Sequence, residues 1–156
     1  MCRIAGFIAH TMNQVDLIRM RDSMLRGGPD DTGTYSDSLN NVFLGHRRLS
    51  LIDLSPTGHQ PMSILDGKIH IVYNGEIYNY KELKSELKAL GRSFHTQSDT
   101  EVILQSYLQW DTDCFDRFNG MFALALYDIT KNELILARDH AGIKPLYYSV
   151  QGESIY

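Results

Sequence analysis

The second residue of the chain, Cys2, is the first group in the sequence that could carry out chemistry. If Met1 is removed, Cys2 bears a free α-amine beside its own thiol. An α-amine has a pKa of about 7.7–8.0 and a free thiol one of about 8.5, so the amine could take the thiol proton directly or through one water. The alternative is that Cys2 is a small apolar residue at the start of a buried strand. Should a chain that keeps Met1 be active, His46 and His70 would be the first bases to examine.

Two adjacent arginines follow in the segment GHRRLSLID, residues 45–53. Arginine binds a carboxylate through two parallel hydrogen bonds. Neighbouring side chains of a strand point to opposite faces, so only one of Arg47 and Arg48 can point into a site. The alternative is that both are solvated surface charges.

The segment YNGEIYNY, residues 73–80, contains a second set of candidates. An Asn-Gly pair normally predicts a hairpin turn, but this pair stands between a strand pattern and the start of a helix pattern. The Asn74 side-chain amide and the Gly75 backbone N–H could form an oxyanion hole, and a glycine lets a substrate approach the backbone closely. Glu76 could hold a cation. A plain turn is the alternative.

The segment SDTE, residues 98–101, places Asp99 in the first turn of a predicted helix. The helix dipole favours the ionised carboxylate there, so Asp99 could accept an ammonium group, or it could simply stabilise the helix. Together, the candidates offer a carboxylate clamp, ammonium acceptors and an oxyanion hole around a nucleophile. This set fits a free α-amino acid with a second carbonyl, for which glutamine is the obvious candidate.

Length and composition restrict the class of protein. A chain of 156 residues suits one domain with its own hydrophobic core. The net charge of -4 argues against nucleic acid or an anionic membrane as the main partner. No apolar run approaches the ~20 residues that span a bilayer. The 2 cysteines form no CxxC pair and the 6 histidines show no ligand spacing, so we expect no metal site and a cytoplasmic protein.

Hydrophobic periodicity and turn residues predict the elements that must position these candidates. We expect strands at 3–9, 41–50, 68–76, 121–128, 133–139 and 145–150, and helices at about 14–25, 79–90 and 99–110. Asn79 with Glu82, and Ser98 with Glu101, have the spacing of a helix cap, and Gly91 can end the second helix. The mostly hairpin order of the strands predicts an α+β fold, with antiparallel sheets and helices outside them.

Two of the expected strands have distinct patterns of burial. Ile69, Ile71 and Tyr73 alternate and should share one face. The strand at 121–128 is apolar throughout, so we expect it to be covered on both faces. The turn ITKNE, residues 129–133, should join it to the next strand as a hairpin.

Seven segments, occurring in a fixed order along the chain, extend these patterns over nearly its whole length. They are MCRIAGF, GGPDDTG, HRRLSLIDLSPTGHQPM, VYNGEIYNY, SDTEVIL, FNGMFALALYD and ARDHAGIKPLYY. With them, the chain resembles the class II glutamine amidotransferase domain of glutamine-hydrolysing asparagine synthetases. SPTGHQPM favours this branch over the glucosamine-phosphate and phosphoribosyl-pyrophosphate members. The chain departs from the family at Gly27, where arginine is usual, and at His140 and Ala141, where an arginine and a bulky residue are usual.

The resemblance implies the N-terminal-nucleophile hydrolase fold, a four-layer αββα sandwich of two antiparallel sheets between helices. It implies that Cys2 is the catalytic nucleophile after Met1 is removed, and that Asn74 and Gly75 form the oxyanion hole. The substrate-binding residues that it implies are Arg48 for the α-carboxylate, Glu76 and Asp99 for the α-amino group, and Leu49 and Leu51 with Asn74 and Gly75 along the pocket.

The resemblance also implies partners outside residues 1–156, which would be the glutaminase domain. In the family, an ATP-dependent synthetase domain follows, uses ATP and magnesium, and makes asparagine or amidates a related acceptor. The glutaminase domain itself needs no cofactor; its partners are L-glutamine and the synthetase domain, and a homodimer is one assembly that the family allows. Two other functions stay open. One is a non-catalytic regulatory or partner-binding module of the same fold, and the other is hydrolysis of a different amide.

Overall fold

The structure is a computed structural model that describes residues 2–50 and 55–156. Its strands form a five-stranded sheet in the order β2-β3-β1-β9-β8 and a four-stranded sheet in the order β4-β5-β6-β7. Each described pair of neighbouring strands is antiparallel. The strands are β1 (Arg3–Ile8), β2 (Asp31–Asp37), β3 (Val42–Arg48), β4 (Met62–Ile64), β5 (Ile69–Ile77), β6 (Gly120–Asp128), β7 (Glu133–Arg138), β8 (Val150–Gln151) and β9 (Ser154–Ile155). The helices are α1 (Gln14–Asp22), α2 (Tyr80–Ala89) and α3 (Asp99–Trp110), with 3-10 turns at Leu25–Gly27, Pro56–Gly58 and Asp111–Arg117.

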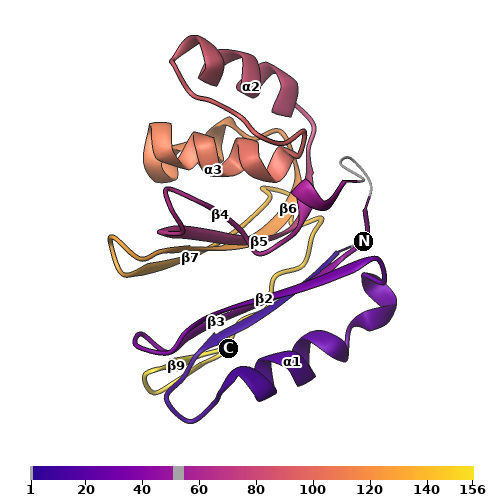
Figure 1. Cartoon of the computed structure of the whole chain (residues 1–156), viewed down its shortest axis with the longest axis vertical. Helices are drawn as coiled ribbons and strands as arrows, with labels where there is room; N and C mark the ends of the chain where they lie inside the picture. Colours follow the sequence, from indigo (N-terminus) through magenta and orange to yellow (C-terminus); the bar gives the residue numbers. More distant parts are fainter. Residues whose placement is uncertain (1, 51–54) are drawn as a thin grey trace.

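The two sheets face each other and carry helices on their outer faces (Figure 1). α1 lies along the five-stranded sheet, whereas α3 lies on the four-stranded sheet and α2 packs on α3. Each sheet therefore buries one face against the other sheet and one against helices, as layered folds require. This arrangement confirms the α+β fold and the αββα sandwich expected from the sequence.

Alternation along β5 divides the core into two layers. Ile69, Ile71 and Tyr73 face α2 and α3 in one apolar cluster, as their spacing predicts. Val72 points the other way and packs with Leu44 of β3 between the sheets. Full burial of an aliphatic side chain contributes about 1.5–3 kcal/mol, so both faces of β5 help to hold the layers together.

Strand β6 is buried on both faces, as its apolar sequence predicts. Every residue from Phe122 to Asp128 is buried, because α3 covers one face of the strand and the other sheet covers the second. The turn to β7 holds Asn132 at a φ of 54°, in the left-handed region that asparagine tolerates. The predicted hairpin over 129–133 is confirmed.

The start of α3 has only half of the predicted capping box. The Ser98 hydroxyl accepts a hydrogen bond from the Thr100 N–H at 3.2 Å. The predicted return bond from Glu101 to the cap is wrong. The Glu101 carboxylate instead accepts hydrogen bonds from the N–H groups of His95 and Thr96 at 2.8 and 2.7 Å, and so ties the preceding loop to the helix.

The predicted cap of α2 is also wrong. The Asn79 side chain accepts a hydrogen bond from the Asn119 N–H and donates one to the Arg117 carbonyl, so it forms no capping box with Glu82. These bonds join the start of α2 to the start of β6. At the other end of α2, Gly91 has a φ of 88°, which confirms that it ends the helix.

Other element boundaries also differ from the predictions. The sequence did not predict β2 and β4, because β2 (DTGTYSD) is polar and β4 spans only Met62–Ile64. The strand expected at 145–150 is wrong: residues 145–149 belong to no strand, and Tyr147 and Tyr148 are 88% and 68% exposed. Aromatic residues favour strands, but a strand also needs a neighbouring backbone, and β8 begins only at Val150. α1 ends at Asp22, earlier than predicted.

Candidate active site

One row of side chains crosses the inner face of the five-stranded sheet where β1 begins and β3 ends. The register of β1 on β3 places Cys2 beside Arg48, and the register of β2 on β3 pairs Arg48 with Asp31. Alternate residues of a strand share a face, and Ile4 packs in the cluster between the sheets. Cys2 and Arg48 therefore face the second sheet.

The two adjacent arginines point to opposite faces, as predicted for a strand. Nη2 of Arg47 lies 3.3 Å from Oδ1 of Asp22, at the end of α1. Arg48 is buried, and its Nη1 donates a hydrogen bond to the Ser55 carbonyl at 3.1 Å. A Cβ on Gly58 would collide with this guanidinium, so the glycine leaves the space that Arg48 occupies.

The Cys2 thiol is partly exposed and lies against the main chain of Leu49. Its Sγ accepts a hydrogen bond from the Leu49 N–H at 3.4 Å and can donate one to the Leu49 carbonyl at 3.5 Å. Nη1 of Arg3 donates to the Cys2 carbonyl at 3.3 Å. The Arg3 side chain fills the space beside Gly27, where a Cβ would lie 2.5 Å from its Nε. The departure from the family at residue 27 therefore accommodates Arg3.

Strand β5 carries the other half of the site along its edge beyond the end of β4. β4 pairs with β5 only as far as Ile71. Beyond Ile71, side chains bind the backbone groups that β4 would otherwise pair with. Oε1 of Gln60 accepts a hydrogen bond from the Tyr73 N–H at 2.7 Å, and Nε2 of His46 lies 3.1 Å from the Tyr73 carbonyl. Alternate residues of a strand direct their backbone groups to the same side, so the Gly75 N–H points to this edge as well.

Asn74 and Gly75 are neighbours on β5, with different surroundings. Asn74 shares the inner face of β5 with Val72, so its amide faces the sheet that carries Cys2. It is buried and forms no side-chain hydrogen bond with a described residue. Gly75 packs so closely against Phe122 of β6 that a Cβ would not fit. Both donors can therefore be used by a ligand that develops negative charge.

The Asp99 carboxylate is buried in the first turn of α3, at the same edge of β5. Its Oδ2 accepts hydrogen bonds from the Tyr73 hydroxyl at 2.7 Å and from the Ile77 N–H at 3.1 Å. Burial raises the pKa of Asp99 above its ordinary value, although these hydrogen bonds act to lower it. A nearby ammonium group would favour the ionised form, so this position suits a cationic ligand.

The Tyr73 hydroxyl lies directly beside the Asp99 carboxylate. Burial raises the pKa of Tyr73 well above its ordinary value, and the charge of Asp99 raises it further. Glu76 lies two residues beyond Asn74 on β5, so it shares the inner face of that strand. The structure thus places both candidate ammonium acceptors along β5.

Two of the sequence predictions fall outside the described residues. Leu51 was predicted to line the pocket, and the removal of Met1 was predicted to free the amine of Cys2. Both stay predictions.

In each of the two histidines considered as alternative bases, one ring nitrogen contacts a backbone carbonyl. His46 contacts the Tyr73 carbonyl, and Nε2 of His70 lies 2.7 Å from the Gly67 carbonyl. Burial lowers the pKa of His46 to about 4 and also lowers that of His70. Burial therefore makes the imidazole of each histidine a weaker base than usual.

Sequence reasoning missed the residues that hold the edge of β5. Gln60 and His46 stand 13 and 27 positions from Tyr73 in the chain, so no local pattern could join them. The available signal was that Gln60 lies in the SPTGHQPM segment and that Tyr73 directly precedes Asn74.

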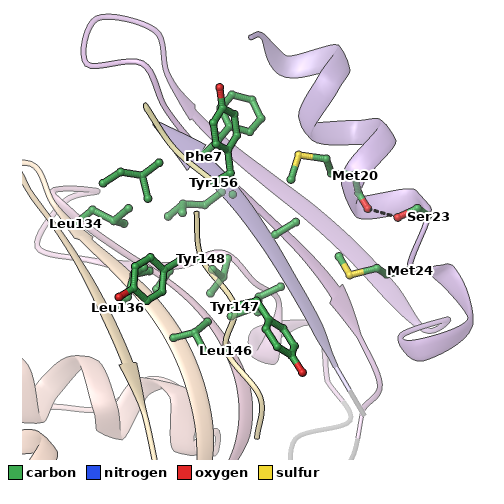
Figure 2. Close-up of a pocket in the computed structure, with 17 residues that line it drawn as sticks. Phe7, Met20, Ser23, Met24, Leu134, Leu136, Leu146, Tyr147, Tyr148 and Tyr156 are labelled. Atoms are coloured by element: carbon green, nitrogen blue, oxygen red, sulfur yellow. Dashed lines mark hydrogen bonds between the residues drawn. The ribbon is translucent and has the colours of Figure 1, made fainter. Parts of the chain in front are cut away.

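A cavity of about 330 Å³ lies along β1, between residues of β7 and the segment at the end of α1. Figure 2 shows Leu136 and Tyr148 on one side of it and Met20 and Met24 on the other. Its lining is mostly apolar and contains none of the candidate site residues. The cavity therefore contributes no reactive group to the site.

The described residues also bear on metal and membrane binding. Within 2–50 and 55–156, no three His, Cys, Asp or Glu side chains cluster as metal ligands would. None of the helices in these ranges has the length and apolar character needed to cross a membrane.

The sequence is similar to a family of glutamine amidotransferase domains and to several curated proteins. A family model described as a glutamine amidotransferase domain matches residues 1–156. The chain is 41% identical over 160 residues to a glutamine-hydrolysing asparagine synthetase of Bacillus subtilis, covering 99% of this chain and 26% of the relative. It is 39% identical over 163 residues to an amidase of Gibberella zeae, covering 96% and 24%. The chain thus spans about a quarter of the length of these curated relatives.

The fold is similar to a solved structure of glutamine phosphoribosylpyrophosphate amidotransferase from Bacillus subtilis, complexed with ADP and GMP. The TM-score is 0.62 and the identity 25%, over 74% of this chain and 27% of the other. This likeness supports the N-terminal-nucleophile hydrolase fold. Because the family match runs the length of the chain and a solved amidotransferase has a similar fold, this chain belongs to the glutamine amidotransferase domain family.

Proposed function

We propose that this domain hydrolyses the γ-amide of L-glutamine to glutamate and ammonia, with Cys2 as the nucleophile. The placement of Cys2, at the start of β1, and Arg48 on the sheet face that is turned toward Asn74 carries this proposal, and the Gly75 N–H points to the adjacent edge of β5. A nucleophile, a cation for a carboxylate and two oxyanion donors would then surround one space. Acyl transfer from an amide needs this combination.

Both charged groups of free glutamine have partners of opposite charge in this arrangement. The Arg48 guanidinium would bind the α-carboxylate through two hydrogen bonds. Glu76 and Asp99 would accept hydrogen bonds from the α-ammonium group, and the main chain of Leu49 with Leu51 would line the pocket. An amide that lacks the two charged groups would lose these contacts, which favours glutamine over another amide.

The proposed reaction has two steps. The α-amine of Cys2, free after Met1 is removed, takes the thiol proton, and the thiolate attacks the side-chain carbonyl carbon of glutamine. The Asn74 amide and the Gly75 N–H donate to the oxyanion. The amine passes its proton to the leaving nitrogen, so ammonia departs and a γ-glutamyl thioester remains. Water, deprotonated by the same amine, then attacks the thioester, which releases glutamate and restores the thiol.

Regions outside the 156 residues would use the ammonia. We propose an ATP-dependent synthetase domain in the same protein, which binds ATP and magnesium and makes asparagine or amidates a related acceptor. The asparagine synthetase relative supports asparagine, and the amidase relative supports keeping the acceptor open. We propose no cofactor for the glutaminase domain itself. A homodimer is compatible with this arrangement, and the two free thiols fit a cytoplasmic location.

A diazo-ketone analogue of glutamine tests the glutaminase proposal. It should label Cys2 and leave Cys114 unlabelled, because burial removes Cys114 from solvent and raises its pKa to about 12. Mass spectrometry of the digested protein locates the label, and excess glutamine should slow the labelling of Cys2. Labelling of Cys114 alone, or labelling of Cys2 that glutamine does not slow, would contradict the proposal.

Arg48→Ala is expected to raise the KM for glutamine by roughly 10- to 100-fold, the loss of a hydrogen bond to a charged group. The effect should fall on KM rather than kcat, because the α-carboxylate is held equally in the ground state and the transition state. Steady-state ammonia release measures both constants. Arg47→Ala is the matched control, since Arg47 pairs with Asp22 on the opposite face. A larger effect at Arg47 would show that the carboxylate binds elsewhere.

A further inference from the structure

The backbone of Tyr73 is held by side chains on the edge of β5 where the pairing with β4 has ended. Gln60, in the segment before β4, accepts a hydrogen bond from the Tyr73 N–H at 2.7 Å, and His46, on β3 of the other sheet, contacts the Tyr73 carbonyl at 3.1 Å. All three residues are buried. A buried backbone group without a partner costs about 1–3 kcal/mol, so these two side chains take the place of the missing strand.

Gln60 is itself held in place by its surroundings. Its Nε2 donates a hydrogen bond to the Thr100 hydroxyl at 3.3 Å, at the start of α3. On the preceding residue, Nδ1 of His59 lies 2.7 Å from the Asp31 carboxylate of β2. The segment that carries Gln60 is therefore fixed to a helix on one side and to the five-stranded sheet on the other. Oε1 is left directed at the Tyr73 N–H.

The Tyr73 peptide directly precedes both candidate oxyanion donors. Beyond them, the Ile77 N–H is bound to Asp99 at 3.1 Å. Asn74 and Gly75 thus lie between two fixed points, on an edge of β5 that pairs with no strand within residues 2–50 and 55–156. A misplacement of about 1 Å at a catalytic group can cost 10²-fold in rate, so the direction of this peptide matters for catalysis.

We propose that Gln60 is a positioning residue of the oxyanion hole. Its side-chain carbonyl fixes the Tyr73 peptide and thereby aims the Asn74 amide and the Gly75 N–H at the oxyanion. This inference rests on the proposed glutaminase function. Because Gln60 acts through Tyr73, its contribution falls on the transition state, in which the oxyanion forms, and not on the binding of glutamine.

The test is Gln60→Met in the complete protein. Methionine has nearly the length of glutamine but no carbonyl to accept the Tyr73 N–H. We expect kcat for ammonia release to fall about 10- to 100-fold while KM stays within about 3-fold. Gln109→Met is the matched control: it makes the same change near the far end of α3, where Oε1 of Gln109 accepts a hydrogen bond from Nε of Arg92 at 3.0 Å, and it should keep kcat within about 2-fold.

A second measurement separates positioning from general damage to the fold. In an Asn74→Ala background, Gln60→Met should lower kcat by a smaller factor than it does in the wild type, because one of the two donors that it positions is already gone. Gln60→Glu keeps an acceptor for the Tyr73 N–H and should restore kcat above the methionine variant. If circular dichroism shows that Gln60→Met does not fold, Gln60→Asn replaces it, since its carbonyl is one methylene too short to reach.

The outcomes distinguish this inference from the proposed function. If the wild-type protein releases no ammonia from glutamine, the proposed function fails. If the wild type is active and Gln60→Met keeps its kcat or raises only KM, the positioning role is overturned and the function stands. Full additivity of Gln60→Met with Asn74→Ala would overturn the positioning role in the same way.

Discussion

Cys2→Ala is expected to lower kcat for glutamine hydrolysis by roughly 10⁴-fold or more, the scale seen when a catalytic nucleophile is removed. Glutamine binding and the fold should persist, because the thiol is needed only for the covalent step. Ammonia release under saturating glutamine measures the loss, and calorimetry of glutamine binding shows that the site remains. Turnover near the wild-type rate would rule out the thioester mechanism.

Cys114→Ala is the control for this substitution. It removes the other thiol of the chain, which is buried in the cluster under α2 and α3, and should leave kcat near the wild-type value.

Intact mass should accompany each assay, because a peptide bond to Met1 turns the α-amine of Cys2 into a non-basic amide. Activity should rise with the fraction of chains that begin at Cys2, and full activity of a uniformly Met1-capped sample would show that another base acts.

Asn74→Ala is expected to lower kcat by roughly 10²- to 10³-fold, as for the loss of one oxyanion donor. KM should change little, since the amide donates strongly only when negative charge develops on the substrate oxygen. Steady-state ammonia release separates the two constants. Asn40→Ala provides a matched amide deletion, because Asn40 is exposed and bonds to Asp37 at the turn between β2 and β3. An Asn74 variant with normal kcat would remove this residue from the mechanism.

Local sequence patterns were sufficient wherever the decisive neighbours are close in the chain. The alternation in β5 correctly placed Ile69, Ile71 and Tyr73 on one face. The strand period correctly separated Arg47 from Arg48. Gly91 ends α2 because a positive φ is a property of that residue and its immediate neighbours.

Long-range contacts explain where the sequence was insufficient. The polar strand β2 exists because the edge of β3 offers it a backbone to pair with. Residues 145–148 belong to no strand despite their aromatic side chains, and Ser149, which exchanges backbone hydrogen bonds with Tyr156, leads into β8. Glu101 has the spacing of a capping residue, but three N–H and O–H donors of the preceding loop compete for its carboxylate. Tyr73 meets Asp99 across 26 positions, a contact that no window along the chain contains.

No single residue of the candidate site indicates its function; the residues do so only together. Cys2 alone has the sequence character of a buried strand residue, and Asn74 with Gly75 has that of a turn. Their order along the chain, together with Arg48 and Asp99, produced the resemblance to glutamine amidotransferases. Roles that depend on geometry, such as that of Gln60, required the structure.

The division of the site between two sheets has a consequence for synthesis on the ribosome. A chain that has emerged as far as β3 already contains Cys2 and Arg48, yet it has no oxyanion donors. Those donors are held in place only after β6 has emerged and paired with β5, and the two sheets must then dock. On the proposed mechanism, a nascent chain would therefore release no ammonia before the sandwich has closed. Conditions that separate the two sheets would abolish the proposed activity even where each sheet keeps its strands paired.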